Sequence, residues 1–296
     1  MKRIAALLLT LMPLMAFAQS YDQLWKSVKD AQEKDLPKTE ISTLEKIISK
    51  ATKEKMYGHL LAATLQRAST QAVISPDSAK VEIERLESMA TKEPSPEVKA
   101  IYYAVLSDIY SNNTELDNHK AKQQEYAGKA MANPDALAKA NASGYEPIVG
   151  KGSDSKIFSD DLLHVIGFLT GDYALLNKYY DAHGNRPAAC ISALKDLTDG
   201  KNIQLSSNGN DIIAKLDSIM NVYKDIPECG EVASERYNLM PQSNNTEAKA
   251  KYEYGEDILS RWPSWTSMSK VRNGQKSLIQ PMLTLNGGSD FSIPKK

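Results

Sequence analysis

The sequence predicts an all-α fold: an antiparallel array of helical hairpins, a second helical bundle, and a short extended C-terminal tail. Apolar residues recur at i, i+3, i+4 and i+7 along most of the 296-residue chain, which is the spacing of a helix with one buried face. Three triplets of Ser or Asn, Pro and an acid mark helix starts. Aromatic residues make up only 7% of the chain and most are tyrosines, which suits a helical bundle better than a β-sandwich.

Residues 1–18 have the pattern of a secretory signal peptide. Lys2 and Arg3 precede an apolar run that closes on Ala16-Phe17-Ala18. A basic start, an apolar stretch and a small-x-small site are the three parts of such a signal. We therefore expect cleavage after Ala18 and export to the periplasm, the cell surface or the medium. The run is too short to span a bilayer comfortably, so we expect no membrane span.

Residues 19–140 are predicted to form the helical-hairpin repeat region. A capping side chain accepts a backbone N–H, Pro lacks the donor that would be unpaired there, and an acid favours the positive helix end. These helix starts are Ser75-Pro76-Asp77, Ser95-Pro96-Glu97 and Asn133-Pro134-Asp135. The apolar faces are Leu24, Val28 and Ala31; Ile41, Leu44, Ile47, Ile48 and Ala51; Leu60, Leu61, Leu65, Ala68 and Ala72; and Val98, Ile101, Val105 and Ile109.

An internal repeat is visible at an offset of 39 residues. Leu44-Glu45-Lys46-Ile47 corresponds to Ile83-Glu84-Arg85-Leu86, and Ala51-Thr52-Lys53-Glu54 to Ala90-Thr91-Lys92-Glu93. Helix pairs of about 34 to 47 residues are the units of tetratricopeptide and HEAT-type arrays. The alternative is a chance similarity between two charged helices. Both interpretations predict a stack of antiparallel helices.

Gly- and Pro-containing residues 141–159 are the predicted linker. Residues 160–275 are predicted to form the second helical bundle, and residues 276–296 an extended tail that leads to downstream domains and includes a strand at Met282–Leu285. The helices expected in the bundle are Leu162–Leu169, Tyr173–Tyr180, Ala188–Leu197, Ile212–Tyr223, Glu228–Leu239 and Ala248–Trp262.

No residue pattern of a catalytic, cofactor or metal site is present, so we expect neither an enzyme nor a cofactor. The four histidines form no i, i+3 or i, i+4 pair, which a helical metal site would need. Asp160, Asp161 and His164 could mimic two ligands, but a solvated helix start is the simpler interpretation because Asp is favoured in a first turn. The net charge of −1 supplies no field for nucleic acid or anionic lipid.

Cys190 and Cys229 are the only two cysteines. A disulfide between them is one alternative, because an exported chain meets oxidising conditions. Two independent buried thiols are the other, because free cysteine is among the most buried residue types. The sequence gives no distance between them.

Several segments resemble the N-terminal helical region of the large alpha-2-macroglobulin-like proteins that Bacteroidetes-type bacteria export. They are Tyr21-Asp22-Gln23-Leu24-Trp25-Lys26 followed by Leu36-Pro37, Ile226-Pro227-Glu228-Cys229-Gly230-Glu231-Val232-Ala233 with Arg236-Tyr237, and Arg261-Trp262-Pro263-Ser264-Trp265. The resemblance implies a helical module ahead of an array of β-sandwich domains that traps proteases. The thioester of that family needs a Gln three residues after its Cys; Val232 stands there, so we expect no covalent inhibition.

Two functions therefore compete. The first is a non-enzymatic exported helical module, the N-terminal part of an alpha-2-macroglobulin-like protease-trapping envelope protein. The second is a free-standing tetratricopeptide-like protein-binding module of the periplasm or cell surface. Protein partners are expected in both, and proteases only through the resemblance, by way of downstream domains. A hydrolase with an unrecognised site is a weaker third alternative.

Overall fold

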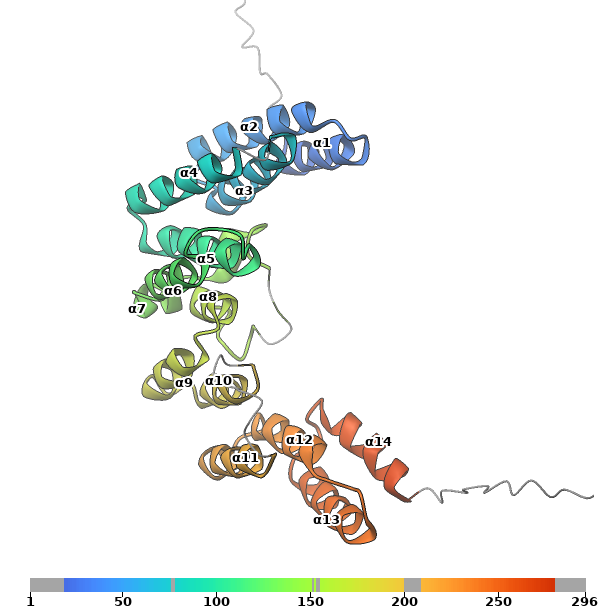
Figure 1. The fold of residues 1–296 in the computed structure, drawn as a ribbon. Coiled ribbons are helices and arrows are strands. Elements are labelled where there is room, and N and C mark those ends of the chain that lie inside the picture. The colour runs from blue at the N-terminus through green and yellow to red at the C-terminus, as the bar shows by residue number, and fades with distance from the viewer. Residues whose placement is uncertain (1–18, 76–77, 151, 153–154, 200–208, 280–296) are drawn as a thin grey trace, which may run out of the picture. The chain divides into compact units, whose positions relative to one another are not determined.

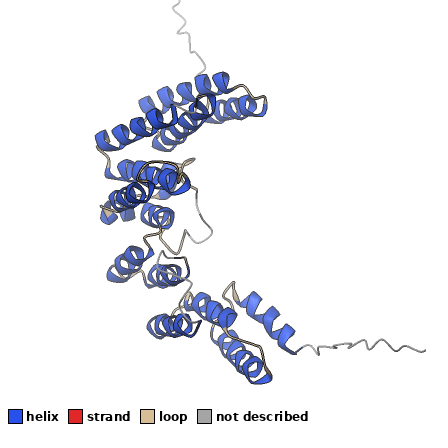
Figure 2. Ribbon diagram, in the orientation of Figure 1, coloured by secondary structure: helices blue, strands red, loops and turns tan. Residues whose placement is uncertain are grey.

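The structure, a computed structural model, describes residues 19–75, 78–150, 152, 155–199 and 209–279. Within those residues it contains fourteen α-helices, one short 3-10 helix and no strand (Figures 1 and 2). The predicted all-α fold is confirmed. The signal peptide, the Met282–Leu285 strand and the rest of the tail from residue 280 lie outside the described residues.

The chain divides into two compact units. Among the described residues, unit 1 runs from residue 19 to residue 152 and includes 160–165, and unit 2 contains 155–159 and continues from 166 to 279. The division falls in and just after the predicted linker, residues 141–159. Helix α8 (Leu162–Thr170) begins in unit 1 and continues into unit 2.

Unit 1 is a series of helices in which α1 to α6 each pack against the next and α7 packs against α5. It ends in a 3-10 turn, Ala142–Tyr145, that packs against α3, and in the first residues of α8. The helices are α1 (Tyr21–Glu33), α2 (Pro37–Glu54), α3 (Tyr57–Ile74), α4 (Ser78–Lys92), α5 (Pro96–Asn112), α6 (His119–Ala130) and α7 (Pro134–Lys139).

The repeat seen in the sequence corresponds to two helices of unit 1. Ala51 of α2 and Ala90 of α4 occupy matched positions and are both fully buried. Helix α5 begins at Pro96, which is 39 residues after the first residue of α3, Tyr57. The offset is therefore the length of one helical hairpin.

Local signals place two helix starts as predicted. Ser95 accepts a hydrogen bond from the backbone N–H of Val98 ahead of α5, and Asn133 accepts one from Ala136 ahead of α7. Pro96 and Pro134 are the first helical residues. Ser75 instead ends α3, since its backbone N–H donates to Gln71 O; the rest of that triplet, 76–77, lies outside the described residues.

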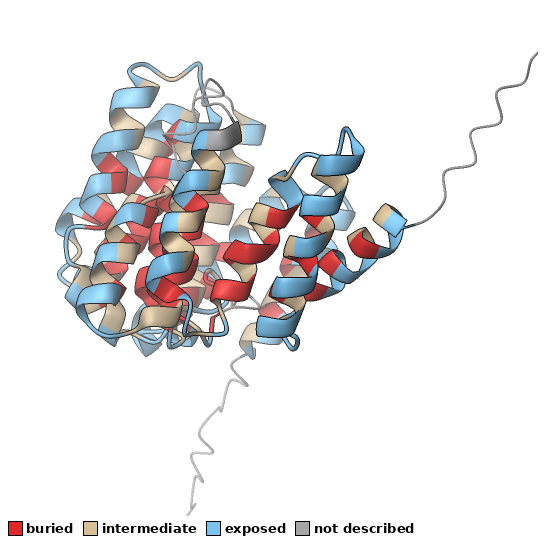
Figure 3. Ribbon diagram, turned by 90° about the horizontal axis from the view of Figure 1, so that it is seen from below, coloured by how far each residue is buried: buried red, intermediate tan, exposed pale blue. Residues whose placement is uncertain are grey.

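Unit 2 contains the second helical bundle, in which α9 to α14 each pack against the next and α12 also packs against α10 and α14. Buried positions gather on the faces where helices meet (Figure 3). Helix α14 continues to Ile279, past the boundary expected at residue 275. Besides the end of α8, the helices are α9 (Tyr173–Ala182), α10 (Arg186–Thr198), α11 (Gly209–Tyr223), α12 (Cys229–Leu239), α13 (Asn245–Arg261) and α14 (Met268–Ile279).

The solvated helix start predicted at residues 160–164 is wrong. Asp161 is 4% exposed and His164 is 7% exposed. Asp161 Oδ1 accepts the backbone N–H of His164 at 2.9 Å and lies 3.0 Å from its Nδ1. The backbone N–H of Leu162 donates to Ala140 O, which holds this start against the preceding chain. The carboxylate caps α8 as expected, but tertiary packing removes it from water.

Candidate functional site: an apolar groove in unit 1

A groove of about 370 Å³ opens between α3, α4 and α5. Its walls are mostly aliphatic, and Glu82 is the one charged residue among them. The lining residues are Leu65, Ala68, Ser69, Ala72, Ala79, Glu82, Ile83, Leu86, Val105, Ile109, Asn113 and Leu116.

Small side chains keep the groove open. Helix α3 presents Ala68, Ser69 and Ala72 to it, and α4 begins its lining with Ala79. These small side chains line the neighbouring helices but do not fill the space between them. Beside them, Val73 at the end of α3 is 80% exposed, so apolar surface extends past the lining.

The internal repeat shows what is unusual about this place. Leu44 of α2 is fully buried in a cluster with Leu24 and Val28 of α1. Its counterpart 39 residues later, Ile83 of α4, is only half-buried and lines the groove. This position of the repeat is therefore covered by large side chains in α2 and left accessible in α4.

A buried ion pair lies beside the groove. Arg67 Nη2 of α3 donates to Glu82 Oε2 of α4 at 2.7 Å, and both side chains are almost fully buried. Arg67 Nε has no hydrogen-bond partner. The charge of Glu82 is therefore compensated within the fold by Arg67.

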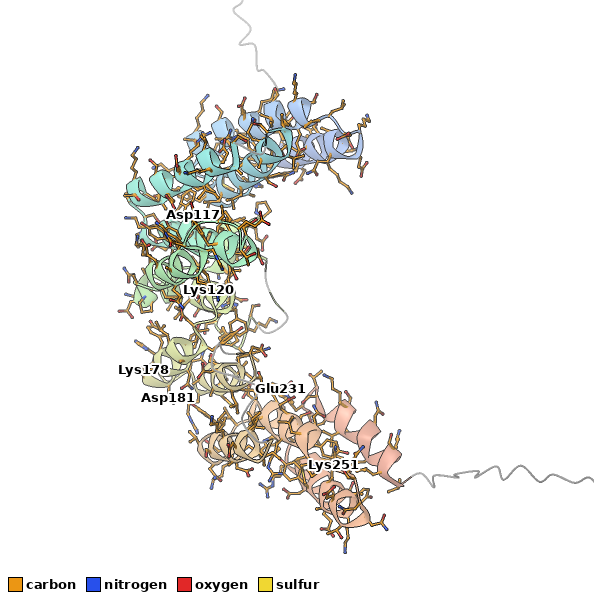
Figure 4. The ribbon with its side chains drawn as sticks, viewed as in Figure 1. Asp117, Lys120, Lys178, Asp181, Glu231 and Lys251 are labelled. Carbon is orange, nitrogen blue, oxygen red and sulfur yellow. The ribbon has the colours of Figure 1, made fainter. Side chains whose placement is uncertain are left out.

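The end of the lining formed by the connection from α5 to α6 is flanked in the chain by acidic residues. Asn113 and Leu116, in the connection between α5 and α6, belong to the lining. Glu115 and Asp117 lie on either side of Leu116 in the chain and are exposed; Figure 4 marks Asp117 at this connection. The nearest cation along the chain is Lys120, in the first turn of α6.

A second polar cluster joins α1 to α3. The indole Nε1 of Trp25 donates to His59 Nδ1 at 2.9 Å, and the Tyr21 ring stacks on His59 with centroids 3.8 Å apart. Burial lowers the pKa of His59 and outweighs the opposing attraction of Asp22 and Glu54. Tyr21 donates to Glu54 at 2.8 Å, and burial with this bond raises the pKa of Tyr21 to about 12. The cluster has a structural role, because the Trp25 indole, His59 Nδ1 and the Tyr21 hydroxyl already have partners within the fold.

Cys190 and Cys229 are both fully buried and are free thiols in the structure. They lie on α10 and α12, which pack against each other. Burial raises the pKa of Cys190, with a smaller contribution from Cys229, and raises that of Cys229 to about 11. Such thiols carry almost no thiolate near neutral pH and are poor nucleophiles.

The segment that resembles a thioester motif is the first turn of α12. Cys229 and Val232 are both fully buried there. Gly230 faces Trp262 and Trp265, and a Cβ at this glycine would lie 3.0 Å from Trp265 Cγ. The residues are therefore explained by packing.

Among the described residues, no group of three or more His, Cys, Asp or Glu side chains is arranged to hold a metal ion. Within the same ranges, no helix is both long and apolar enough to cross a membrane. No protein-family model, curated protein or solved structure matches this chain. The class that the fold and groove define is a helical-hairpin protein with an accessible apolar surface between two hairpins.

Proposed function

We propose that the chain is a non-enzymatic helical module that binds another protein through the groove between α3, α4 and α5. The observation that carries this proposal is an open apolar groove with one charged residue in its lining, at a repeat position that is closed elsewhere in unit 1. Apolar surface of this kind costs free energy in water and marks a site for a ligand or protein. The signal-like pattern of residues 1–18 supports the further proposal that this activity belongs to the periplasm or the cell surface.

Photo-crosslinking in the producing cell tests the proposal. A benzophenone amino acid at Asn113, which lines the groove, should form a discrete protein adduct. Ser69→Trp should fill the groove and abolish the adduct, because Ser69 lines it from α3. Thr52→Trp, at an exposed position of α2, is the matched control and should leave the adduct intact. No adduct, or an adduct indifferent to Ser69→Trp, would contradict binding at the groove.

The resemblance to alpha-2-macroglobulin-like proteins supports a more specific proposal: this module is the N-terminal part of such an envelope protein. Two of the segments that carry the resemblance meet in unit 2. Trp262 Nε1 donates to Ile226 O at 3.2 Å, and Trp265 Nε1 donates to Glu231 Oε2 at 2.7 Å. The two segments therefore form one packed joint of unit 2, so the resemblance extends to residues that lie together in the fold.

A sequencing read past the codon for Lys296 and an inhibition assay test this second proposal. If downstream domains follow, the longer protein should inhibit proteases while the 296-residue chain does not. Methylamine should not be incorporated in the Cys229–Val232 segment, because Val232 offers no acyl group to form the amide. Mass spectrometry showing methylamine addition in this segment would overturn that expectation.

A further inference from the structure

We propose that the occupant of the α3–α5 groove is a basic amphipathic helix of a partner protein, which inserts large aliphatic side chains and places a lysine or arginine at the acidic end. This inference rests on the proposed function and specifies the partner's chemistry.

The secondary structure of the walls favours a helical occupant. The groove is lined by helices, whose backbone N–H and C=O groups bond within each helix. An extended peptide would find no strand edge there and would leave its own backbone groups unpaired. A helix satisfies its backbone bonds internally and needs only to bury one face. Within unit 1, α1 already covers Leu44 in this way, with Leu24 and Val28 four residues apart.

The volume and lining define the apolar face of the occupant. An apolar cavity of about 150 Å³ holds a benzene-sized group, so the groove has room for about two large side chains. Ala68, Ala72 and Ala79 have short side chains. They leave room in the groove for a branched or long aliphatic side chain of the partner. Leucine or methionine at i and i+3 or i+4 of the partner would lie over Ile83 and Val105.

The charges near the groove specify the polar part of the occupant. Glu115 and Asp117, on either side of Leu116 in the chain, are acidic and exposed, and no basic residue lines the groove. A cationic side chain at that end gains attraction, whereas an acidic one is repelled. The charge of Glu82 is already paired with Arg67 and adds nothing to this preference.

A pair of designed peptides tests the inference. Each is a labelled amphipathic helix of about 18 residues, or five turns, with the same leucine face; one carries lysines beside that face and the other glutamates. Fluorescence anisotropy with the full mature chain should show the lysine peptide binding about tenfold more tightly than the glutamate peptide. Ser69→Trp should abolish binding of both.

Charge reversal provides the internal control. The double variant Glu115→Lys, Asp117→Lys should reverse the preference, whereas the matched Asp30→Lys, Glu33→Lys, at exposed positions of α1, should preserve it. Equal affinities for the two peptides, or binding of neither, would overturn the basic-helix inference. If the peptides fail in this way but the photo-crosslinked adduct at the groove still forms in cells, the proposed function stands and the partner has a different chemistry. Self-association that Ser69→Trp abolishes would assign the groove to a second copy of this chain and also overturn the inference.

Discussion

Trp25 and His59 join α1 to α3 through a hydrogen bond that requires an unprotonated imidazole nitrogen, His59 Nδ1. Burial lowers the folded pKa of His59 below its unfolded value, which is about 6.5. The unfolded chain therefore binds more protons in this range, and stability rises with pH. The contribution is present above about pH 6.5 and is lost as the pH falls through the folded pKa.

We expect wild-type protein to lose about 1 kcal/mol more than His59→Phe between about pH 7.5 and pH 5, the net value of one hydrogen bond. Phenylalanine keeps a ring to stack on Tyr21 but cannot accept from Trp25. Urea unfolding of both proteins at the two pH values measures the difference, and His119→Phe on α6 is the control. An identical pH dependence for wild type and His59→Phe would contradict the assignment.

Gly58 is required by a close approach of two backbones. A Cβ at this position would lie 2.1 Å from Glu146 O and 2.5 Å from the Tyr145 carbonyl carbon. Gly58→Ala should therefore destabilise unit 1 by about 1–3 kcal/mol, a typical cost of overpacking. Gly128→Ala in α6 meets nothing within 4 Å and should stabilise by about 0.5–1 kcal/mol. Chemical unfolding that gave both variants the same sign would show that the contact is absent.

At the scale of the element, helix starts were predictable and their burial was not. Caps act within one turn, so Ser95 and Asn133 could be identified from neighbouring residues alone. Asp161 has the same local chemistry, yet it is buried because chain from Ala140 packs over it. Nothing within four residues of Asp161 carries that information.

The joint between α12 and the connection from α13 to α14 is an element-scale feature of unit 2. Both indoles donate to α12 or the chain just before it, and Trp262 is 7% exposed. Trp262→Ala should cost about 3–5 kcal/mol, as expected for a buried large aromatic residue. Trp265→Phe should cost about 1 kcal/mol, since it loses mainly the bond to Glu231. Denaturant unfolding followed by circular dichroism measures both, and a loss below about 1 kcal/mol for Trp262→Ala would contradict the packing.

At the scale of the whole molecule, the fold class follows from helical periodicity, but the groove does not. The periodicity identifies Ile83 and Leu86 as apolar-face residues of α4 without saying which of them a neighbour covers. That depends on how closely α3 and α4 approach, and Ala68, Ala72 and Ala79 read as ordinary helix formers in the sequence. The repeat offers the one sequence signal: Leu44 and Ile83 are equivalent, so their burial can be compared once the structure is known.

The oxidation state of the two cysteines is a testable property of the whole molecule. The structure contains two buried free thiols, so folded protein should resist alkylation near pH 8, where thiols with raised pKa values stay protonated. Unfolding without reductant should then reveal both, by thiol titration. A count of zero after unfolding would show instead that Cys190 and Cys229 pair, the other alternative that the sequence left open.

Binding of a basic amphipathic helix in the α3–α5 groove is tested most directly by hydrogen exchange of the full mature chain with and without the lysine peptide. Helical amides exchange through local opening, which a bound ligand suppresses. We predict slower exchange over residues 65–72, 79–86 and 105–116, with α9 to α14 unchanged. Protection confined to unit 2, or no protection at a peptide concentration that saturates the anisotropy signal, would contradict it.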